Sequence, residues 1–425
     1  MKIEDVRTEK NGDRQRIAAT VTWEDCDRPK QEVYFETDNA FSDGLSPNPH
    51  AFLVGGILPA MRHGEERVFV DGAICPDLRD GLITVMSWMK SWYYGPDKKL
   101  VTIEAKTSSG KRARTQERAG CFFSGGVDSL GMLRNNRLHY PLDHPSSIKD
   151  GILIYGQNWE SDDRPETFER AVAELSEVTR DAGITLIPIY TNVRSLDEET
   201  KFFQYQFHAA VLAAVAHALA ARFSAMLISS SSHIPNLFLR KREHFGPWGS
   251  HPLIDPWYSS SDMKIRHEDL SMSRIDKIRL ISQWDAGLQN IKVCPPNYPG
   301  ENCGVCEKCV RTELGLLALG VLDKTRAFPL NDLSADLITQ FQIDEDKMQF
   351  YLELLQPLAN IGRDDLVQAI GHIRKKLKKR ESKLRKKVRQ YKLGVKSKVK
   401  QFDSEYLNGH LIKLKRSLSH STKES

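Results

Sequence analysis

The chain lacks the features that define membrane and secreted proteins. Its longest apolar run, His208 to Ala221, is rich in alanine, contains two histidines and is too short to cross a bilayer as a helix. The first residues, Met1 to Asp5, contain no apolar core of the kind found in secretory signals. We therefore expect a cytoplasmic protein without a transmembrane segment. No internal repeat is present.

Cysteine is scarce, and most of it lies in one place. The chain has seven cysteines, and four of them form the array C-x8-C-x2-C-x2-C, at Cys294, Cys303, Cys306 and Cys309. An odd number with this crowding favours a metal site over a disulfide framework. Four thiolates at this spacing can close a tetrahedral Zn²⁺ site and leave no open position, which predicts a structural zinc. An iron–sulfur cluster is the alternative that the same spacing allows.

Charge is distributed unevenly along the chain. The net charge is +5, but residues 371–400 contain fifteen Lys or Arg and one acidic residue, a net charge of +14, which leaves −9 on the rest. Apolar residues recur every seven positions in this region, at Ile370, Leu377, Leu384 and Tyr391. This pattern predicts one basic helix over residues 364–400 with a narrow apolar stripe. Such a helix could bind nucleic acid, a protein partner or an acidic membrane, or stay solvated.

One stretch of the sequence organises the rest. Residues 119–122 form a short apolar strand pattern, and the string Ser-Gly-Gly-Val-Asp-Ser follows at 124–129, where a helix is expected to begin. Two adjacent glycines allow a tight turn and a close approach of the backbone to a ligand. The first N–H groups of the helix, from Val127 to Leu130, would then face an anion. A Walker A loop is excluded, because no Gly-Lys-Ser/Thr follows.

The side chains of this turn suit a nucleotide. Ser124 and Ser129 add hydroxyl donors, and Asp128 adds an oxygen that could hold Mg²⁺. We interpret the stretch as a cradle for pyrophosphate. Its predicted binding residues are Phe123, Ser124, Gly125, Gly126, Val127, Asp128, Ser129 and Leu130.

The string at 124–129 resembles the PP-loop of the N-type ATP pyrophosphatases, adenine-nucleotide alpha-hydrolase-like enzymes that split ATP between its α- and β-phosphates. The run from Cys303 to Arg311, with Gly320 and Asp323, is similar to the zinc segment of 7-cyano-7-deazaguanine synthase, the nitrile synthase of the queuosine pathway. That family also consists of PP-loop ATPases. The resemblance covers residues 118–323 and implies ATP at the 124–129 turn and zinc at the four cysteines.

The same resemblance implies that Tyr155 to Asn158 border the adenosine. It does not extend to a substrate loop, of which His251 to Asp255 is only a faint echo, nor to the N-terminal unit or the basic tail. The acceptor is therefore not identified by the resemblance. A divergent member of the family is expected rather than the pathway enzyme itself.

Strand and helix patterns alternate after Ala119, which predicts an α/β fold with a doubly wound parallel sheet. We expect three domains: a β-rich accessory domain over 1–115, a PP-loop ATPase domain over 116–323 that includes the zinc segment 290–323, and a helical region with the basic tail over 324–425. Ligands in such sheets bind beyond the carboxyl ends of the strands. The residues predicted around this crevice are Ser124, Tyr155, Gly156, Asn192, Val193, Arg194 and 229–233.

Three local patterns add further expectations. Asp71-Gly72 predicts a hairpin turn within Arg67–Ile74. The run Lys201 to Arg222 predicts one long helix, and residues 244–269 predict an active-site loop. Candidate acceptor or catalytic side chains in these two segments are His208, His217, His251, Asp255 and Asp262.

Together these features predict an ATP-dependent adenylating, ligase-like enzyme that uses ATP, Mg²⁺ and a structural Zn²⁺. Asp128 and Ser129 are its predicted catalytic residues. An acceptor, which we expect to be a carboxylate, would be activated for attack by a nitrogen nucleophile, with release of pyrophosphate and then AMP. Two alternatives stay open: a non-catalytic nucleotide-binding subunit or sensor of a larger assembly, and a PP-loop sulfur-transfer enzyme with a reactive cysteine such as Cys121.

Overall fold

The computed structural model describes residues 1–108, 117–156, 165–237, 247–294 and 302–383. These residues belong to two compact units, Met1–Leu333 and Ser334–Ser425. Within the described ranges, no helix has both the length and the apolar content that crossing a bilayer requires.

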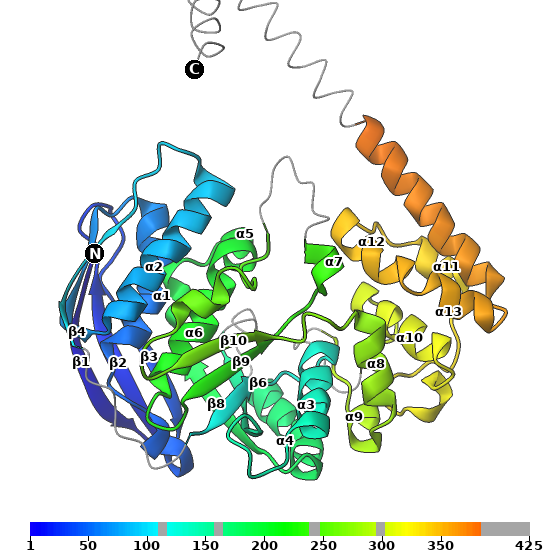
Figure 1. Ribbon diagram of the computed structural model, residues 1–425, viewed down its shortest axis with the longest axis horizontal. Helices are drawn as coiled ribbons and strands as arrows, with labels where there is room; N and C mark the ends of the chain where they lie inside the picture. The colour runs from blue at the N-terminus through cyan, green and yellow to red at the C-terminus, as the bar shows by residue number, and fades with distance from the viewer. Residues whose placement is uncertain (109–116, 157–164, 238–246, 295–301, 384–425) are drawn as a thin grey trace, which may run out of the picture. The chain divides into compact units, whose positions relative to one another are not determined.

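A ten-stranded sheet forms the frame of the first unit (Figure 1). Its strands are β1 Lys2–Asn11, β2 Arg14–Thr22, β3 Gln31–Asp38, β4 Arg67–Ile74, β5 Thr102–Thr107, β6 Ala119–Phe122, β7 Ile148–Tyr155, β8 Thr185–Thr191, β9 Ala225–Ser229 and β10 Lys264–Glu268. Their order across the sheet is β10-β9-β6-β7-β8-β3-β2-β1-β4-β5.

The sheet is mixed and mostly parallel. Strands β10, β9, β6, β7 and β8 are parallel to one another, which confirms the parallel strands predicted after Ala119. Strand β3 joins β8 in the antiparallel direction, with Phe35 opposite Thr191 and Thr37 opposite Ile189. The pairs β3–β2 and β2–β1 are also antiparallel. The segment predicted as a β-rich accessory domain therefore extends the same sheet.

Helices cover the sheet from both sides. The α-helices of this unit are α1 Pro49–His63, α2 Pro76–Met89, α3 Val127–His139, α4 Pro165–Asp181, α5 Thr200–Phe202, α6 His208–Ala218, α7 Ile234–Leu237, α8 Arg274–Ser282, α9 Asp285–Gln289 and α10 Glu307–Ala318. The 3₁₀ turns are η1 Asn39–Gly44, η3 Val193–Leu196, η5 Asp255–Tyr258 and η6 Leu322–Lys324, and the π-helical turns are η2 Lys90–Tyr94 and η4 Phe203–Phe207.

Two hydrophobic cores lie on opposite faces of the sheet. The larger core joins the strands to α1, α2 and α6, with Phe35, Phe52 and Val211 fully buried. The second core joins β6, β7 and β9 to α3, α4 and α8–α10, with Phe168 and Ile281 fully buried. Because the strands are buried by helices on both faces, they contain the near-continuous apolar runs seen in the sequence.

The predicted hairpin at Asp71-Gly72 is wrong, because Arg67–Ile74 is the single strand β4. Its pairing with β5 shifts register between Phe69 and Ala73, as at a β-bulge. A Cβ atom at Gly72 would lie 3.1 Å from Cγ of Pro49, the first residue of α1. Glycine at this position therefore serves close packing on α1 and not a turn.

The predicted helix over Lys201–Arg222 is interrupted by the π-helical turn η4. Gly249 lies against this turn: its N–H donates to the Gln204 carbonyl oxygen (2.9 Å), and its own carbonyl oxygen accepts from the Ala209 N–H (3.0 Å). The Tyr93 hydroxyl donates to the Tyr205 carbonyl oxygen (2.7 Å). The backbone groups that a regular helix would pair internally are thus satisfied by distant segments.

The segment 244–269, predicted as a loop, contains η5 and the edge strand β10 in its described part. Strand β10 pairs with β9 in parallel register, with Ile265 opposite Met226 and His267 opposite Ile228. Only two of its five side chains, Ile265 and His267, face the larger core, so its apolar signal is weak.

The second unit contains short helices and the start of the basic helix. These are α11 Ala335–Thr339, α12 Glu345–Leu352, α13 Leu355–Asn360 and a helix over residues 364–383. The predicted apolar stripe is confirmed at Ile370 and Leu377, which are buried. Leu384, Tyr391 and most of the basic run lie outside the described residues.

Candidate functional site

The turn between β6 and α3 has the conformation that its glycines predict. Gly125 has φ +72°, in the left-handed region that glycine adopts without strain. Its carbonyl oxygen accepts from the Lys292 N–H (2.8 Å). A Cβ atom at Gly125 would lie only 2.5 Å from Cδ2 of Leu175 on α4. Backbone conformation and packing therefore both require glycine at position 125. A Cβ atom at Gly126, in contrast, would have no neighbour closer than 3.4 Å.

The first turn of α3 presents backbone N–H donors beyond the carboxyl end of β6. Gly126 is the N-cap, so the N–H groups of Val127, Asp128 and Ser129 have no acceptor within the helix. The Leu130 N–H donates to the Gly126 carbonyl oxygen (2.9 Å), so the predicted donor role of Leu130 is wrong. The helix uses that group for its own first hydrogen bond. Three donors and the positive end of the helix dipole remain for an anion.

The side chains of the turn divide into buried and accessible ones. Phe123 and Val127 are buried in the second core, so only their backbone could reach a ligand. Ser124 is exposed. The Ser129 hydroxyl donates to the Gly126 carbonyl oxygen (3.1 Å) and is largely buried. Of the two predicted hydroxyl donors, Ser124 is thus the accessible one.

Asp128 is held by two cations from α8. Its Oδ1 atom lies 3.4 Å from Nζ of Lys277 and 3.7 Å from Nη1 of Arg274. Burial alone would raise the pKa of Asp128, but the charges of Lys277 and Arg274 lower it below its ordinary value. The carboxylate is therefore ionised at neutral pH and lies beside the free N–H groups of α3.

Lys277 and Arg274 are functional candidates that the sequence prediction missed. A capping box formed by Ser273 and Asp276 begins α8 and was visible in the sequence. The two cations are three residues apart on that helix and so share a face. Only the packing of α8 on α3 shows their target: a Cβ atom at Gly131 would lie 2.9 Å from Cβ of Lys277.

Of the other residues predicted around the crevice, some contact the β6–α3 turn through Lys277 and others contact different parts of the protein. The side chain of Asn192 binds the backbone of β3, with its Oδ1 accepting from Tyr34 N–H (2.9 Å). The guanidinium of Arg194 lies 4.5 Å above the ring of Phe203. At the end of β9, the Ser230 carbonyl oxygen accepts from Lys277. The end of β9 is thus tied to the turn, whereas Asn192 and Arg194 make structural contacts.

Strand β7 ends beside an aromatic group. The ring centroid of Tyr155 lies 5.2 Å from that of Phe168 and 5.7 Å from that of Tyr190. A Cβ atom at the next residue, Gly156, would lie 1.9 Å from the Thr191 carbonyl oxygen. Tyr155 therefore lies at the predicted sheet edge. Gln157 and Asn158, the other expected neighbours of adenosine, lie outside the described residues.

Asp255 belongs to a buried cluster on the other face of the sheet. Its carboxylate accepts from the Ser250 hydroxyl (2.7 Å) and from the His251 N–H (2.9 Å), and pairs with Nδ1 of His267 (2.7 Å). This cluster ties the segment before η5 to β10. The N–H of Asp262 donates to the Ser260 hydroxyl (3.3 Å) in the turn before β10.

The two helix histidines have different surroundings. His217 is fully buried, and its Nε2 donates to the Tyr258 carbonyl oxygen (2.8 Å). His208 is half-buried beside the ring of Phe203. Burial lowers the pKa of each to about 4. Both imidazoles are therefore neutral at pH 7, and the contacts of His217 are those of a packed core residue.

The four predicted cysteines converge. The Sγ atom of Cys309 lies 3.8 Å from that of Cys303 and 3.7 Å from that of Cys294, and all four Sγ atoms lie within 4.8 Å of one another. A Zn–S distance of about 2.3 Å gives a tetrahedral edge of about 3.8 Å. None of the four forms a disulfide. The geometry fits a metal held by four thiolates.

Asn302 supports this cysteine cluster and was missed from the sequence. Its Oδ1 accepts from the N–H groups of Val293 (2.8 Å) and Cys294 (3.0 Å). Its Nδ2 donates to the carbonyl oxygens of Ile291 (2.7 Å) and Ala327 (2.8 Å). One buried amide thus makes four hydrogen bonds, which join the segment 291–294 before the cysteine loop to Ala327 after it.

No second cluster of this kind exists among the described residues, where the four cysteines are the only group of three or more potential ligands. Asp128 is a single carboxylate already paired with cations. Mg²⁺ keeps several waters and is commonly bound by one or two carboxylates together with substrate phosphates. Asp128 therefore fits the predicted Mg²⁺ only as one ligand in a set completed by phosphate and water.

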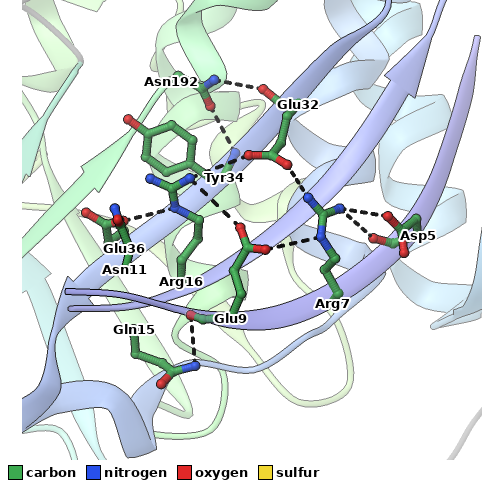
Figure 2. A network of polar contacts seen from close by, with 10 residues as sticks. All are labelled: Asp5, Arg7, Glu9, Asn11, Gln15, Arg16, Glu32, Tyr34, Glu36 and Asn192. Atoms are coloured by element: carbon green, nitrogen blue, oxygen red, sulfur yellow. Dashed lines mark hydrogen bonds and ion pairs between the residues drawn. The ribbon is translucent and has the colours of Figure 1, made fainter. Parts of the chain in front are cut away.

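A separate polar network covers the face of β1–β3 that is turned away from the larger core (Figure 2). Arg7 pairs with Asp5 (2.8 Å), Glu9 (3.3 Å) and Glu32, and Arg16 pairs with Glu36 (2.9 Å). Charges of both signs alternate across the face, and both arginines are paired with carboxylates of the same strands, four carboxylates in all. We therefore interpret it as a solvated surface and place the candidate site at the β6–α3 turn.

No protein-family model, curated protein or solved structure matches the chain.

Proposed function

We propose that the protein is an ATP-dependent adenylating enzyme of the PP-loop type, similar to the 7-cyano-7-deazaguanine synthase family. One observation carries the proposal: the β6–α3 turn combines a left-handed Gly125, three free helix N–H groups and Asp128 with its two cations. It lies at the carboxyl end of parallel strands, where α/β sheets bind ligands. We further propose that the parallel part of the sheet has the adenine-nucleotide alpha-hydrolase-like fold.

The residues of the turn would act mainly by binding. The N–H groups of Val127 to Ser129 and the Ser124 hydroxyl donate to the β- and γ-phosphates. Lys277 and Arg274 neutralise charge that grows on the leaving pyrophosphate, and Asp128 holds these cations in position. Mg²⁺ would bind at Asp128 and the phosphates and would supply further charge neutralisation. Ser129, with its hydroxyl turned to Gly126, would contribute its N–H.

The reaction would proceed in two transfers. A carboxylate oxygen of the acceptor attacks the α-phosphorus, the bond to the β-phosphate oxygen breaks, and pyrophosphate leaves. The product is a mixed anhydride between the acceptor and AMP. A nitrogen nucleophile then attacks the acyl carbon, loses a proton to solvent and displaces AMP. The protein contributes alignment and charge stabilisation rather than a covalent step.

The cysteine cluster, the basic run and the N-terminal segment would have supporting roles in this enzyme. The four cysteines would hold a structural Zn²⁺, because the thiolates leave no position open for substrate. The basic run over 371–400 would bind a nucleic acid or protein partner, and the protein would act in the cytoplasm. Residues 1–115 would be an accessory part of the enzyme.

The sulfur-transfer alternative is disfavoured at Cys121. This thiol is fully buried in β6, and burial raises its pKa to about 12. A transfer cysteine must reach substrate and needs an accessible thiolate. Cys121 therefore packs in the core, and we prefer the adenylating function.

The test is the nucleotide product. Purified protein with ATP, Mg²⁺, an ammonium salt as the nitrogen source and a panel of carboxylates should release AMP and pyrophosphate, separated by ion-exchange chromatography. Asp128→Asn should lower kcat/KM by roughly 100-fold or more, because the cations of α8 lose their charged partner. Asp143→Asn, at an exposed residue beyond the far end of α3, is the control and should match wild type. Release of ADP and phosphate would reject the proposal, and ATP binding without turnover would favour a sensor.

A further inference from the structure

The helix over residues 364–383 ends in a concentrated patch of positive charge. Between Asp365 and Glu381 the sequence contains no acidic residue. Residues 374–383, which we call the basic patch, contain seven Lys or Arg and have a net charge of +6. The seven cations are Arg374, Lys375, Lys376, Lys378, Lys379, Arg380 and Lys383. All seven are exposed, so their charge is available at the surface.

The cations of the basic patch are not neutralised within the described part of the chain. Among the described residues, none of the seven side chains forms an ion pair or a hydrogen bond. The surface of β1–β3 is different, because Arg7 pairs there with Asp5 (2.8 Å) and Glu9 (3.3 Å), as Figure 2 shows. A dense group of cations without carboxylate partners creates a positive potential that attracts a polyanion.

The apolar face of this helix is not available to a partner. Ile370, Ile373 and Leu377 are 0%, 4% and 8% exposed. Leu377 is also the only apolar residue of the basic patch. A helix that lies in a membrane interface inserts an exposed apolar face, and a protein partner is usually held by apolar or aromatic anchors. The basic patch has neither, so its recognition chemistry is that of charge alone.

The cations surround most of the helix. At 100° per residue, those from Arg374 to Arg380 are distributed over about 240° of its circumference. None of the residues 378–383 is buried, so this end is accessible from several sides. A flat lipid surface contacts one side of a helix, whereas the two walls of a groove contact both flanks. The distribution of charge therefore favours a groove lined by phosphates.

The dimensions of nucleic-acid grooves distinguish DNA from RNA. An α-helix with its side chains is about 10–12 Å in diameter, and the major groove of B-form DNA is about 12 Å wide. The major groove of an A-form RNA duplex is too deep and narrow for side chains to read.

We infer that the basic patch binds double-stranded DNA, with the end of the helix in the major groove and its cations on the phosphates of both strands. Phosphate contacts carry no sequence information, so binding should depend little on base sequence. This inference narrows the partner that the proposed function assigns to the basic run. It does not depend on the reaction at the β6–α3 turn.

The experiment measures binding of the full-length protein to a fluorescent DNA duplex by anisotropy at several salt concentrations. The test variant combines Lys375→Gln, Lys379→Gln and Lys383→Gln, which follow one line on the face opposite Leu377. Glutamine is a good helix former, so circular dichroism should show an unchanged helix content. At about 0.15 M salt the variant should bind at least 10-fold more weakly, and the slope of log K against log salt should fall by about 2–3.

The matched control removes the same charge from exposed positions of the first unit. It combines Lys30→Gln, Lys99→Gln and Lys106→Gln and should bind DNA like wild type. Equal loss of affinity in both triple variants would overturn the inference, because net charge rather than the basic patch would then determine binding. Wild-type affinity in the test variant, or no DNA binding by the wild-type protein, would also overturn it.

Two competitors separate DNA from the other polyanions. An RNA duplex of the same sequence and vesicles that contain phosphatidylserine should each displace the DNA poorly. Displacement by either one at an equal concentration of phosphate groups would overturn the groove geometry and assign the patch to RNA or to a membrane. AMP release should be the same in the test variant and in wild type, so failure of this inference and failure of the adenylating function are seen in different assays.

Discussion

Asp128 and Asp255 illustrate what determines the role of a single side chain. Asp128 lies in a six-residue string at a helix start, so adjacent residues set its backbone position, whereas its two cations come from the distant helix α8. Asp255 is held by Ser250, by His251 and by His267, which comes from a strand that the sequence pattern did not reveal. Its buried pairing with His267 could be seen only after β10 had been placed beside β9.

Two buried histidines predict a pH dependence of stability. Burial lowers the pKa of His217 to about 4, and burial together with the charge of His217 lowers that of His50 to about 3. In the unfolded chain both titrate near 6.5. Between pH 4 and 6.5 the unfolded state binds more protons, so the free energy of unfolding should rise with pH across this window and then level off.

Chemical denaturation at several pH values measures this effect. For His217, a pKa of about 4 against 6.5 corresponds to roughly 3 kcal/mol at full effect. His217→Gln should therefore reduce the slope between pH 4 and 6.5. His144→Gln, at an exposed residue, should leave it unchanged. An unchanged slope in His217→Gln would show that the buried imidazole is not the titrating group.

Among the elements, the β6–α3 turn was predicted well because its information is local. The apolar strand, the two glycines and the helix start follow one another without a gap, and each is observed. The interrupted helix around η4 and the strand β10 were not predicted, because a distant segment decides each of them. Gly249 accepts and donates the backbone hydrogen bonds at η4, and β9 supplies the partner of β10.

Gly125→Ala tests this turn. The substitution combines backbone strain at φ +72° with overlap on Leu175, so we expect a loss of about 2–4 kcal/mol in the free energy of unfolding and weaker ATP binding. Gly183→Ala is the matched control, because Gly183 has φ +65° and no atom within 4 Å of an added Cβ. It should lose only about 1 kcal/mol, the cost of the left-handed conformation alone. Equal losses in chemical denaturation would show that Leu175 moves aside freely.

At the scale of the first unit, the pairing of β3 with β8 makes one sheet from segments predicted as separate domains. The side chain of Thr37 donates to the Pro188 carbonyl oxygen (2.7 Å), and a Cβ atom at Gly55 of α1 would lie 2.6 Å from Cγ2 of Val193. One core runs from β1 to α6. Removing either half would expose an unpaired strand edge and part of that core.

We therefore expect Met1–Leu333 to unfold as one cooperative unit. In native-state hydrogen exchange followed by mass spectrometry, β2 and β8 should open with the same free energy under increasing denaturant. A Thr37→Val variant, which removes one bond across the junction, should lower both values together. Opening of β1–β3 at a clearly lower free energy than β6–β9 would show that the N-terminal segment is an independent domain.

The sequence alone determined the features that depend on adjacent residues: the alternation of strands and helices, the glycine turn with Asp128, and the four cysteines whose spacing fits one metal. Tertiary structure decided what depends on contacts between distant segments. It placed Lys277 and Arg274 beside Asp128 and paired β3 with β8. The physical reason is that local hydrogen bonding and steric preference act over a few residues, whereas charge pairing and strand pairing act between any segments that packing brings together.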